Sequence, residues 1–349
     1  MESKSMSKAA KTSAFVIVYL ILIVALAPAA EPNATEAFKM NKLLGRGINL
    51  GNALEAPNEG ELGVTLKEEY FDIIKQAGFD SVRLPVRWSA HALSEKPYTI
   101  DPKFFKRVDW AVNCALSRNL PVTLDVHHYH ELCGDPANHK DRFLALWRQI
   151  AEHYRDYPDT LVFELLNDPY NKIRANELNL LLKQSLAVVR ESNPNRIVVF
   201  GSANYNNIDY LKFLKIPKED RNIIATFHYY EPYQFTHQGV SWEKDSNDWL
   251  GKKWVGSDAE KQAVVKEFDI AADWAKENSR PINLGEFGVH KNADMDSRAR
   301  WTKFVTDTAV ERGFSIHYWE FCADEFGLYD QQTKSFRKPL LEAVVPPKK

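Results

Sequence analysis

The feature that most constrains this chain is a repeated alternation of short β-branched runs with longer amphipathic stretches, which begins near residue 40. Eight runs are expected strands: 46–50, 81–85, 122–126, 161–166, 197–200, 223–227, 282–285 and 315–319. Strand and helix alternating eight times are typical of a (β/α)8 barrel. A doubly wound open sheet is the alternative, but no Gly-x-Gly-x-x-Gly follows a strand run, so its nucleotide-binding version loses support. The sequence therefore predicts an α/β protein with a single (β/α)8 TIM barrel.

Helix start signals lie between these runs. Two Ser/Thr-x-x-Glu capping boxes, at 65–68 and 257–260, predict that helices begin there. Asp101 before Pro102 predicts another start, with the acid as N-cap and proline at the first helical position. Apolar periodicity predicts further helices over 142–154, 177–190 and 298–311.

The first thirty residues are typical of a secretory signal peptide. Lysines precede an uncharged apolar run over 13–30, and small residues close it at Ala27, Ala29 and Ala30. A retained membrane anchor is the alternative, because about 18 apolar residues can span a bilayer. We expect a signal peptide over 1–30, one domain over 31–349, a secreted or periplasmic protein, and no membrane association after cleavage.

Charge and cysteine content exclude several classes of protein. With 45 basic and 47 acidic residues the net charge is −2, which gives no electrostatic reason to expect a nucleic acid as partner. Three dispersed Cys do not form a disulfide scaffold. Nine Trp require a large core or a flat ligand.

Polar residues follow seven of the eight expected strands, and the active site of a barrel lies at the carboxyl ends of its strands. The candidates in chain order are Asn52, Glu55, Arg83, His127, His128, Asn167, Asp168, His228, Tyr230, Glu286 and Trp319. Asp168 and Glu286 follow opposite strands, which suits a paired-carboxylate mechanism on a glycosidic bond. Arg83, His228 and Tyr230 are expected to keep Glu286 ionised. A barrel-mouth ion network without turnover is the alternative.

His127, His128, His130 and Cys133 raise the question of a metal site. Successive strand residues point to opposite faces, so His127 and His128 do not both line one cavity if the strand continues regularly. No neighbouring pattern resembles a closed zinc site. We therefore expect one substrate-facing histidine with the other packed beside it, no metal and no cofactor.

The strand-end motifs together resemble glycoside hydrolase family five of clan A, and in particular its cellulase-type endoglucanases. The resemblance covers about residues 40 to 345 and runs through the segments 46–52, 82–85, 125–128, 164–169, 228–230, 285–288 and 319–320. It implies retaining, endo-acting hydrolysis of β-1,4-glucan, with mannan or mixed-linkage glucan as alternative substrates.

The resemblance also implies roles for individual residues. Glu286 is similar to the family nucleophile, and Arg83 and Tyr230 are similar to its hydrogen-bond partners. Asn167 would hold the sugar 2-hydroxyl, and Trp319 would stack beneath the sugar being cleaved. His127, His128 and His228 would line the site. Asn52 and Glu55, after the first strand, would contact sugars further along the cleft.

One position departs from the family motif Asn-Glu-Pro, because this chain has Asn167-Asp168-Pro169. The shorter Asp168 withdraws its carboxyl by roughly 1.3 to 1.5 Å on an unchanged backbone. The distance between the carboxyls of Asp168 and Glu286 then moves toward the gap between two ranges. Retaining enzymes have ~5 to 5.5 Å between their carboxyls, and inverting enzymes have ~6.5 to 9.5 Å. Three explanations for Asp168 are open. The backbone shifts to compensate for the shorter side chain, the enzyme is weak, or the Asp is an introduced change that removes turnover and keeps binding. Glu164 lies too deep to substitute as the acid.

The longest expected connection, 231–256, holds five aromatic residues: Tyr233, Phe235, Trp242, Trp249 and Trp254. Such rings stack on sugar faces or pin the loop to the barrel. An open cleft with stacking platforms suits internal cleavage of a polymer. We expect a β-linked polysaccharide or oligosaccharide as partner and a monomeric protein, and a catalytically silent glucan-binding barrel is the second reading.

Overall fold

A computed structural model describes residues 1–2 and 35–347, and its eight main strands form one closed parallel barrel in chain order. The strands are β1 (Arg46–Asn49), β2 (Ser81–Leu84), β3 (Val122–Asp125), β4 (Leu161–Glu164), β5 (Val198–Gly201), β6 (Ile223–Tyr229), β7 (Ile282–Phe287) and β8 (Ser315–Tyr318). Closure comes from parallel pairing of β8 with β1. The expected TIM barrel is thus confirmed.

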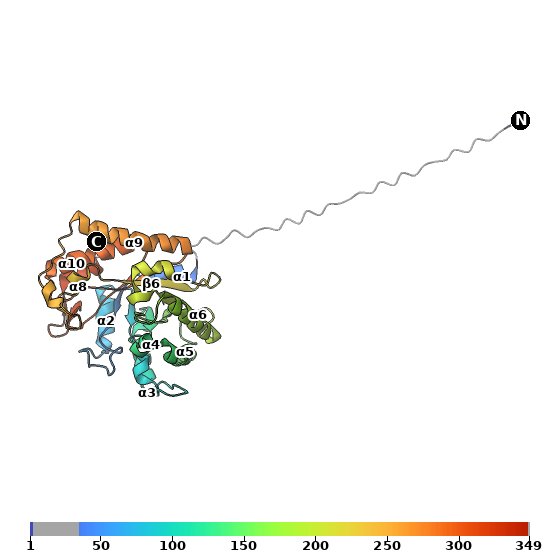
Figure 1. Cartoon of the computed structure of the whole chain (residues 1–349), viewed down its shortest axis with the longest axis horizontal. Helices are drawn as coiled ribbons and strands as arrows, with labels where there is room; N and C mark the ends of the chain where they lie inside the picture. The colour runs from blue at the N-terminus through green and yellow to red at the C-terminus, as the bar shows by residue number, and fades with distance from the viewer. Residues whose placement is uncertain (3–34, 348–349) are drawn as a thin grey trace. The chain divides into compact units, whose positions relative to one another are not determined.

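The long helices lie outside the strands, with α9 and α10 on one side of β6 and α5 and α6 on another (Figure 1). They are α2 (Glu68–Ala77), α3 (Pro102–Leu116), α5 (Pro136–His153), α6 (Ala175–Ser192), α9 (Asp258–Asn278) and α10 (Met295–Glu311). The shorter elements are α1 (Glu36–Leu44), η2 (Trp88–His91), α4 (His130–Gly134), α7 (Ala203–Asn206), η3 (Ile208–Phe213), α8 (Tyr233–Thr236), η4 (Ser246–Trp249), β9 (Tyr329–Asp330), β10 (Ser335–Phe336) and α11 (Lys338–Val344).

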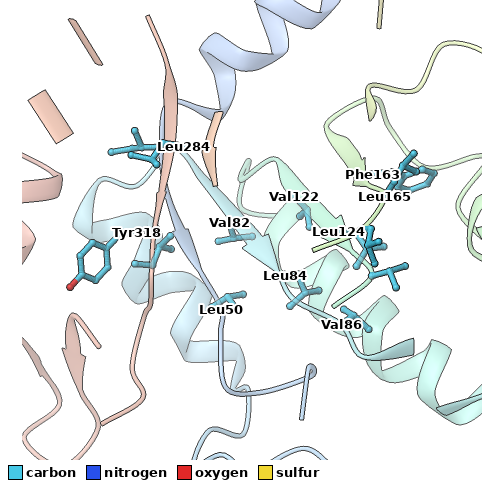
Figure 2. Close-up of a cluster of buried hydrophobic side chains, with 14 of the residues drawn as sticks. Leu50, Val82, Leu84, Val86, Val122, Leu124, Phe163, Leu165, Leu284 and Tyr318 are labelled. Atoms are coloured by element: carbon cyan, nitrogen blue, oxygen red, sulfur yellow. The ribbon is translucent and has the colours of Figure 1, made fainter. Parts of the chain in front are cut away.

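The two faces of the strands have opposite chemistry. Apolar residues such as Val82, Leu84, Val122 and Leu124 belong to the main hydrophobic core (Figure 2). Arg83, between two of them, is equally buried and contacts polar groups of other strands. Because side chains alternate along a strand, the apolar set packs against the helices and the polar set fills the barrel interior. This alternation carries charged groups into the centre of the protein.

Helix α1 covers the amino-terminal end of the barrel. Its buried residues Ala37, Met40 and Leu44 pack with Val162, Ile197, Val199 and Ile224 in a separate apolar cluster. Val162, Val199 and Ile224 are the second residues of β4, β5 and β6, and Ile197 directly precedes β5. The apolar seal at this end leaves the opposite, carboxyl end as the place for polar chemistry.

One of the two expected capping boxes is wrong. Ser257 and Glu260 form both bonds of the box at the start of α9, and Asp101 caps α3 through Lys103 N. At α2, however, Lys67 is the N-cap residue and no side-chain cap bond exists. The backbone N–H of Leu66 donates instead to Glu59 Oε1 at 2.8 Å, so a side chain from the preceding loop contacts the backbone here.

Several bounds differ from those expected. The expected helix over 142–154 begins six residues earlier, at Pro136, because proline is well suited to the first helical turn. Strands β6 and β7 run to Tyr229 and Phe287, two residues past their expected ends. Residues 3–30 of the expected signal peptide lie outside the described residues. Among the described helices, none has the length and apolar character needed to cross a membrane.

Candidate active site

Arg83 is the centre of the polar interior. It is fully buried on β2, and its guanidinium forms a bidentate pair with Glu164, with Nε to Oε2 at 2.7 Å and Nη2 to Oε1 at 2.9 Å. Nη1 donates to Glu286 Oε1 and to Asn49 Oδ1, each at 2.8 Å, and Nη2 donates to Asn167 Oδ1 at 2.6 Å. Although burial opposes it, the surrounding carboxylates raise the pKa of Arg83 well above its ordinary value. The Arg83 guanidinium therefore links the carboxyl ends of β1, β2, β4 and β7.

Asp125 and His127 form the second part of this network. Asp125 Oδ2 lies 2.9 Å from Arg83 Nη2 and 2.7 Å from His127 Nδ1, and Oδ1 accepts from Val86 N at 2.9 Å. Burial raises the pKa of Asp125 to about 7 and lowers the pKa of His127 well below its ordinary value. A neutral His127 with its proton on Nδ1 accepts from Asn167 Nδ2, 3.2 Å from Nε2. Both ends of the Asn167 amide are thus fixed, and its second N–H remains for a ligand.

Glu286, on β7, is held by partners on both carboxylate oxygens. Arg83 Nη1 donates to Oε1, and Tyr230 OH donates to Oε2 at 3.0 Å. His228 Nδ1 lies 3.7 Å from Oε2. The three expected partners all lie at this carboxyl, and the ionisation that they were expected to favour stays a prediction. Burial raises the pKa of Glu286 by more than His228 and Arg83 lower it.

Asp168 lies beside Glu286 and is the more accessible of the two carboxyls. Its side chain is 32% exposed against 6% for Glu286, and its backbone is left-handed, with φ of 44°. His228 Nδ1 lies 2.9 Å from Asp168 Oδ1. Although burial opposes it, this contact lowers the pKa of Asp168. The two carboxyls share one histidine and titrate as a pair, so the distribution of their proton depends on what occupies the cleft.

Asp168, His228 and Glu286 are also the described residues whose ligand-type atoms converge, all within 4.8 Å of one another. A divalent cation there would lie beside the Arg83 guanidinium, which is already 2.8 Å from Glu286. Like charges at such distances repel strongly in a buried site. The arrangement suits movement of a proton between the groups better than metal binding.

His127 and His128 do not follow the expected alternation. Strand β3 ends at Asp125, so both histidines lie beyond the regular strand, and His128 has a left-handed backbone with φ of 50°. Their rings meet edge to face, 4.4 Å apart. Trp319 lies parallel to the His127 ring at 5.9 Å and packs against Gly51, where a Cβ would lie 2.8 Å from the indole. The half-buried indole therefore has a fixed orientation.

The two candidates after β1 are used differently. Asn52 lines a cavity of about 570 Å³ formed with the loops after β7 and β8. Glu55 is 1% exposed, and its carboxylate accepts from the backbone N–H groups of Asn52 and Ala53. Burial raises its pKa to about 8. The structure therefore places Asn52 on this cavity, which no other candidate residue lines, and uses Glu55 to hold the loop.

The aromatic residues of the 231–256 connection divide into two sets. Phe235 and Trp254 are 2% and 1% exposed and pin the loop to the barrel. Tyr233 and Trp249 are half-buried, and Trp242 is 56% exposed. Only the second set is placed where a ring can meet a ligand.

Sequence reasoning missed three groups that the structure adds to the site. Asp125 lies in the segment 125–128 that carries the family resemblance but had no expected role, and Glu164 was considered only as a substitute acid. Asn206 follows β5, the one strand end without a candidate, and its Nδ2 lies 3.2 Å from His228 Nε2. Asparagines are frequent in loops, so no local signal distinguished Asn206.

The fold and site together define a class: a (β/α)8 barrel with a carboxylate pair and an arginine-centred network at the carboxyl ends of its strands. Residues 52–325 match the family described as Cellulase (glycosyl hydrolase family 5), and the chain belongs to that family.

Related proteins are consistent with this assignment. Endoglucanase H of Acetivibrio thermocellus is 36% identical over 325 residues, covering 92% of this chain and 35% of that protein. Cel5A of Thermotoga maritima, solved in complex with cellobiose, is 49% identical with a TM-score of 0.87, and the match covers 89% of this chain and all of that one. The same Cel5A solved in complex with mannotriose is 50% identical, with equal TM-score and coverage. The chain spans about a third of the length of the first curated relatives it matches.

Proposed function

We propose that this protein is a retaining endo-β-1,4-glucanase, with Glu286 as nucleophile and Asp168 as general acid and base. The observation that carries the proposal is the convergence of Asp168 and Glu286 at the mouth of the barrel. One oxygen of each lies within 4.8 Å of the other. This limit on the distance between the nearest oxygens suits the retaining spacing of about 5 to 5.5 Å better than the inverting spacing, which leaves room for a water between the carboxyls.

Glu286 is suited to attack because its carboxylate is oriented before substrate arrives. Arg83 and Tyr230 each donate to one oxygen, and the side chain is 6% exposed. In the first step an oxygen of Glu286 bonds to the anomeric carbon as the glycosidic C–O bond breaks. The result is a covalent glycosyl-enzyme.

Asp168 is suited to the proton transfers because it is the carboxyl that faces the cleft. In the first step its proton goes to the leaving glycosidic oxygen. In the second step it accepts a proton from the water that displaces Glu286, and configuration is retained. A bound sugar would remove water from Asp168 and so raise its pKa, which favours the protonated acid.

The substrate class follows from the cleft and from the relatives. Trp319 and the half-buried to exposed rings of the 231–256 connection offer flat apolar surfaces, and the interior groups that reach the cleft offer hydrogen bonds. Cel5A has been solved with cellobiose and with mannotriose, so β-linked glucan is the first candidate substrate and mannan the second. Residues 31–349 would form the catalytic domain of an exported protein.

Hydrolysis of carboxymethylcellulose tests this function. We expect the native chain to release reducing ends, and the isosteric Asp168→Asn variant to lose about a hundredfold or more, because an amide cannot donate the proton. A silent native chain with an active Asp168→Glu variant would support the binding-barrel reading. No activity in either would reject the enzyme function.

A 2-deoxy-2-fluoro-cellobioside with a good leaving group tests the nucleophile. It should accumulate a covalent adduct on Glu286, because the fluorine slows both formation and hydrolysis of the glycosyl-enzyme, whereas the good leaving group speeds only its formation. Peptide mapping by mass spectrometry locates the adduct. Labelling of any other residue would overturn the assignment.

A further inference from the structure

His228 is held from the side opposite the carboxyls by residues that follow β5. Asn206 is fully buried, and its Nδ2 lies 3.2 Å from His228 Nε2. On another side the ring packs against Gly285, where a Cβ would lie 3.1 Å from Nε2. The other nitrogen, Nδ1, faces Asp168 at 2.9 Å and Glu286 at 3.7 Å. The imidazole therefore connects Asn206 to both carboxyls.

The segment after β5 is shaped to deliver this amide. Asn204, Tyr205 and Asn206 have φ values of 56°, 61° and 52°, a run of left-handed residues without glycine. Such conformations are costly and persist where the surroundings determine them. Gly201 makes room, because a Cβ there would lie 2.3 Å from Asn206 Oδ1. Tyr205 N also donates to Pro169 O at 3.0 Å, which ties the segment to the Asp168 loop.

We infer that Asn206 is a positioning residue: its amide N–H on Nε2 keeps the single proton of His228 on Nδ1, the nitrogen that faces Asp168 and Glu286. An N–H donor at Nε2 requires a lone pair there, so it stabilises the neutral imidazole and opposes the imidazolium. The inference rests on the proposed function, since it matters through the acid role of Asp168.

The consequence for catalysis follows from charge. An imidazolium 2.9 Å from Asp168 would hold that carboxyl ionised, whereas the first step needs it protonated. The charged or titratable groups that face His228 are Asp168, Glu286, Arg83, His127 and Asp125. Burial and Arg83 lower the pKa of His228, but the carboxylates of Glu286 and Asp168 raise it by more. A donor on Nε2 would act against this rise.

The pH dependence of kcat/KM on a phenyl cellobioside, a substrate that needs protonation of its leaving group, gives the first test. The alkaline limb reports the acid in the free enzyme. Asn206→Asp places an acceptor on Nε2, favours the imidazolium, and should move this limb to lower pH by about one unit. Asn206→Gly, which also suits the left-handed backbone, should give a smaller shift in the same direction. Gly201→Ala should resemble Asn206→Gly, because its methyl displaces the amide.

Two controls separate positioning from damage to the fold. Asn204→Gly changes an exposed residue of the same left-handed run and should leave the limb in place. The second control uses 2,4-dinitrophenyl cellobioside, whose leaving group needs no proton. With this substrate the pH dependence of kcat/KM of the Asn206 variants should no longer show the shifted alkaline limb. A uniform loss of rate with both substrates and no shift would overturn the inference.

A second readout does not require activity. In protein labelled with 15N-histidine, the His228 signals, assigned by their absence in His228→Gln, should show a protonated Nδ1 and an unprotonated Nε2 at neutral pH. A proton on Nε2 would overturn the inference even in an active enzyme. If the protein shows the expected tautomer of His228 but hydrolyses no glycoside, the proposed function is rejected. The positioning of His228 by Asn206 would then still stand.

Discussion

Arg83 shows how one residue organises an active site. Its planar guanidinium contacts Glu164 as a fork and reaches Glu286 and Asn167 with the remaining N–H groups. Lysine carries the same charge but cannot reproduce that geometry. Because every partner is buried, each lost contact leaves a carboxylate or amide without a donor.

Arg83→Lys should therefore damage both stability and chemistry. We expect the free energy of unfolding in urea to fall by about 3 kcal/mol or more, the scale for breaking a buried charge pair. The kcat/KM on a soluble glucan should fall at least about a hundredfold, because Glu286 and Asn167 lose their orientation. The exposed pair of Arg148 and Glu191 provides a control, since Arg148→Lys should change neither quantity measurably. A stable, active Arg83→Lys enzyme would contradict the central role of the fork.

At the scale of the element, the strand ends are what the fold contributes to function. Candidates from strands far apart in sequence meet because eight carboxyl ends share one rim, and α1 seals the other end. The chain supplied good local evidence for the elements themselves. It could not show that Glu164 pairs with Arg83, because that contact joins residues 81 positions apart in sequence. Glu55 turns into its own loop, and its burial there depends on the rest of the barrel.

The two Ser/Thr-x-x-Glu motifs allow a matched test of helix capping. Ser257 accepts from Glu260 N at the start of α9, whereas Thr65 is exposed and caps nothing. Ser257→Ala should lower the free energy of unfolding by about 1 kcal/mol. Thr65→Ala should change it by less than about 0.5 kcal/mol. Equal losses in thermal or urea unfolding would show that the difference between the two helix starts is not energetic.

At the scale of the whole molecule, buried acids make stability depend on pH. Burial raises the pKa of both Glu55 and Glu320 to about 8. Each accepts backbone N–H groups from its own loop, and one oxygen of Glu320 has no hydrogen-bond partner among the described residues. A carboxyl whose pKa is raised on folding binds its proton more tightly in the native state.

This stabilisation is complete below the unfolded pKa of these groups and is lost as pH rises toward about 8, so these two carboxyls stabilise the fold more at pH 5 than at pH 8. Buried histidines whose pKa is lowered, such as His237 and His317, contribute the opposite slope. Glu320→Gln keeps an acceptor for Cys322 N and Ala323 N without a titrating group. It should remove at least about 1 kcal/mol of the pH dependence measured by urea unfolding. Glu219→Gln, at an exposed site, should leave the slope unchanged.

The sequence by itself determined the elements, their order and the chemistry available at most strand ends. Those properties are encoded locally, in side-chain periodicity, in caps such as Ser257 and in motifs such as Asn167-Asp168-Pro169. Only the tertiary structure decided which groups meet. Barrel closure brings Arg83 to Glu164 and Asn206 to His228, and burial raises the pKa of Glu286 against its charged neighbours. The physical reason is that hydrogen-bond distance and desolvation are set by residues far apart in the chain, which no local pattern specifies.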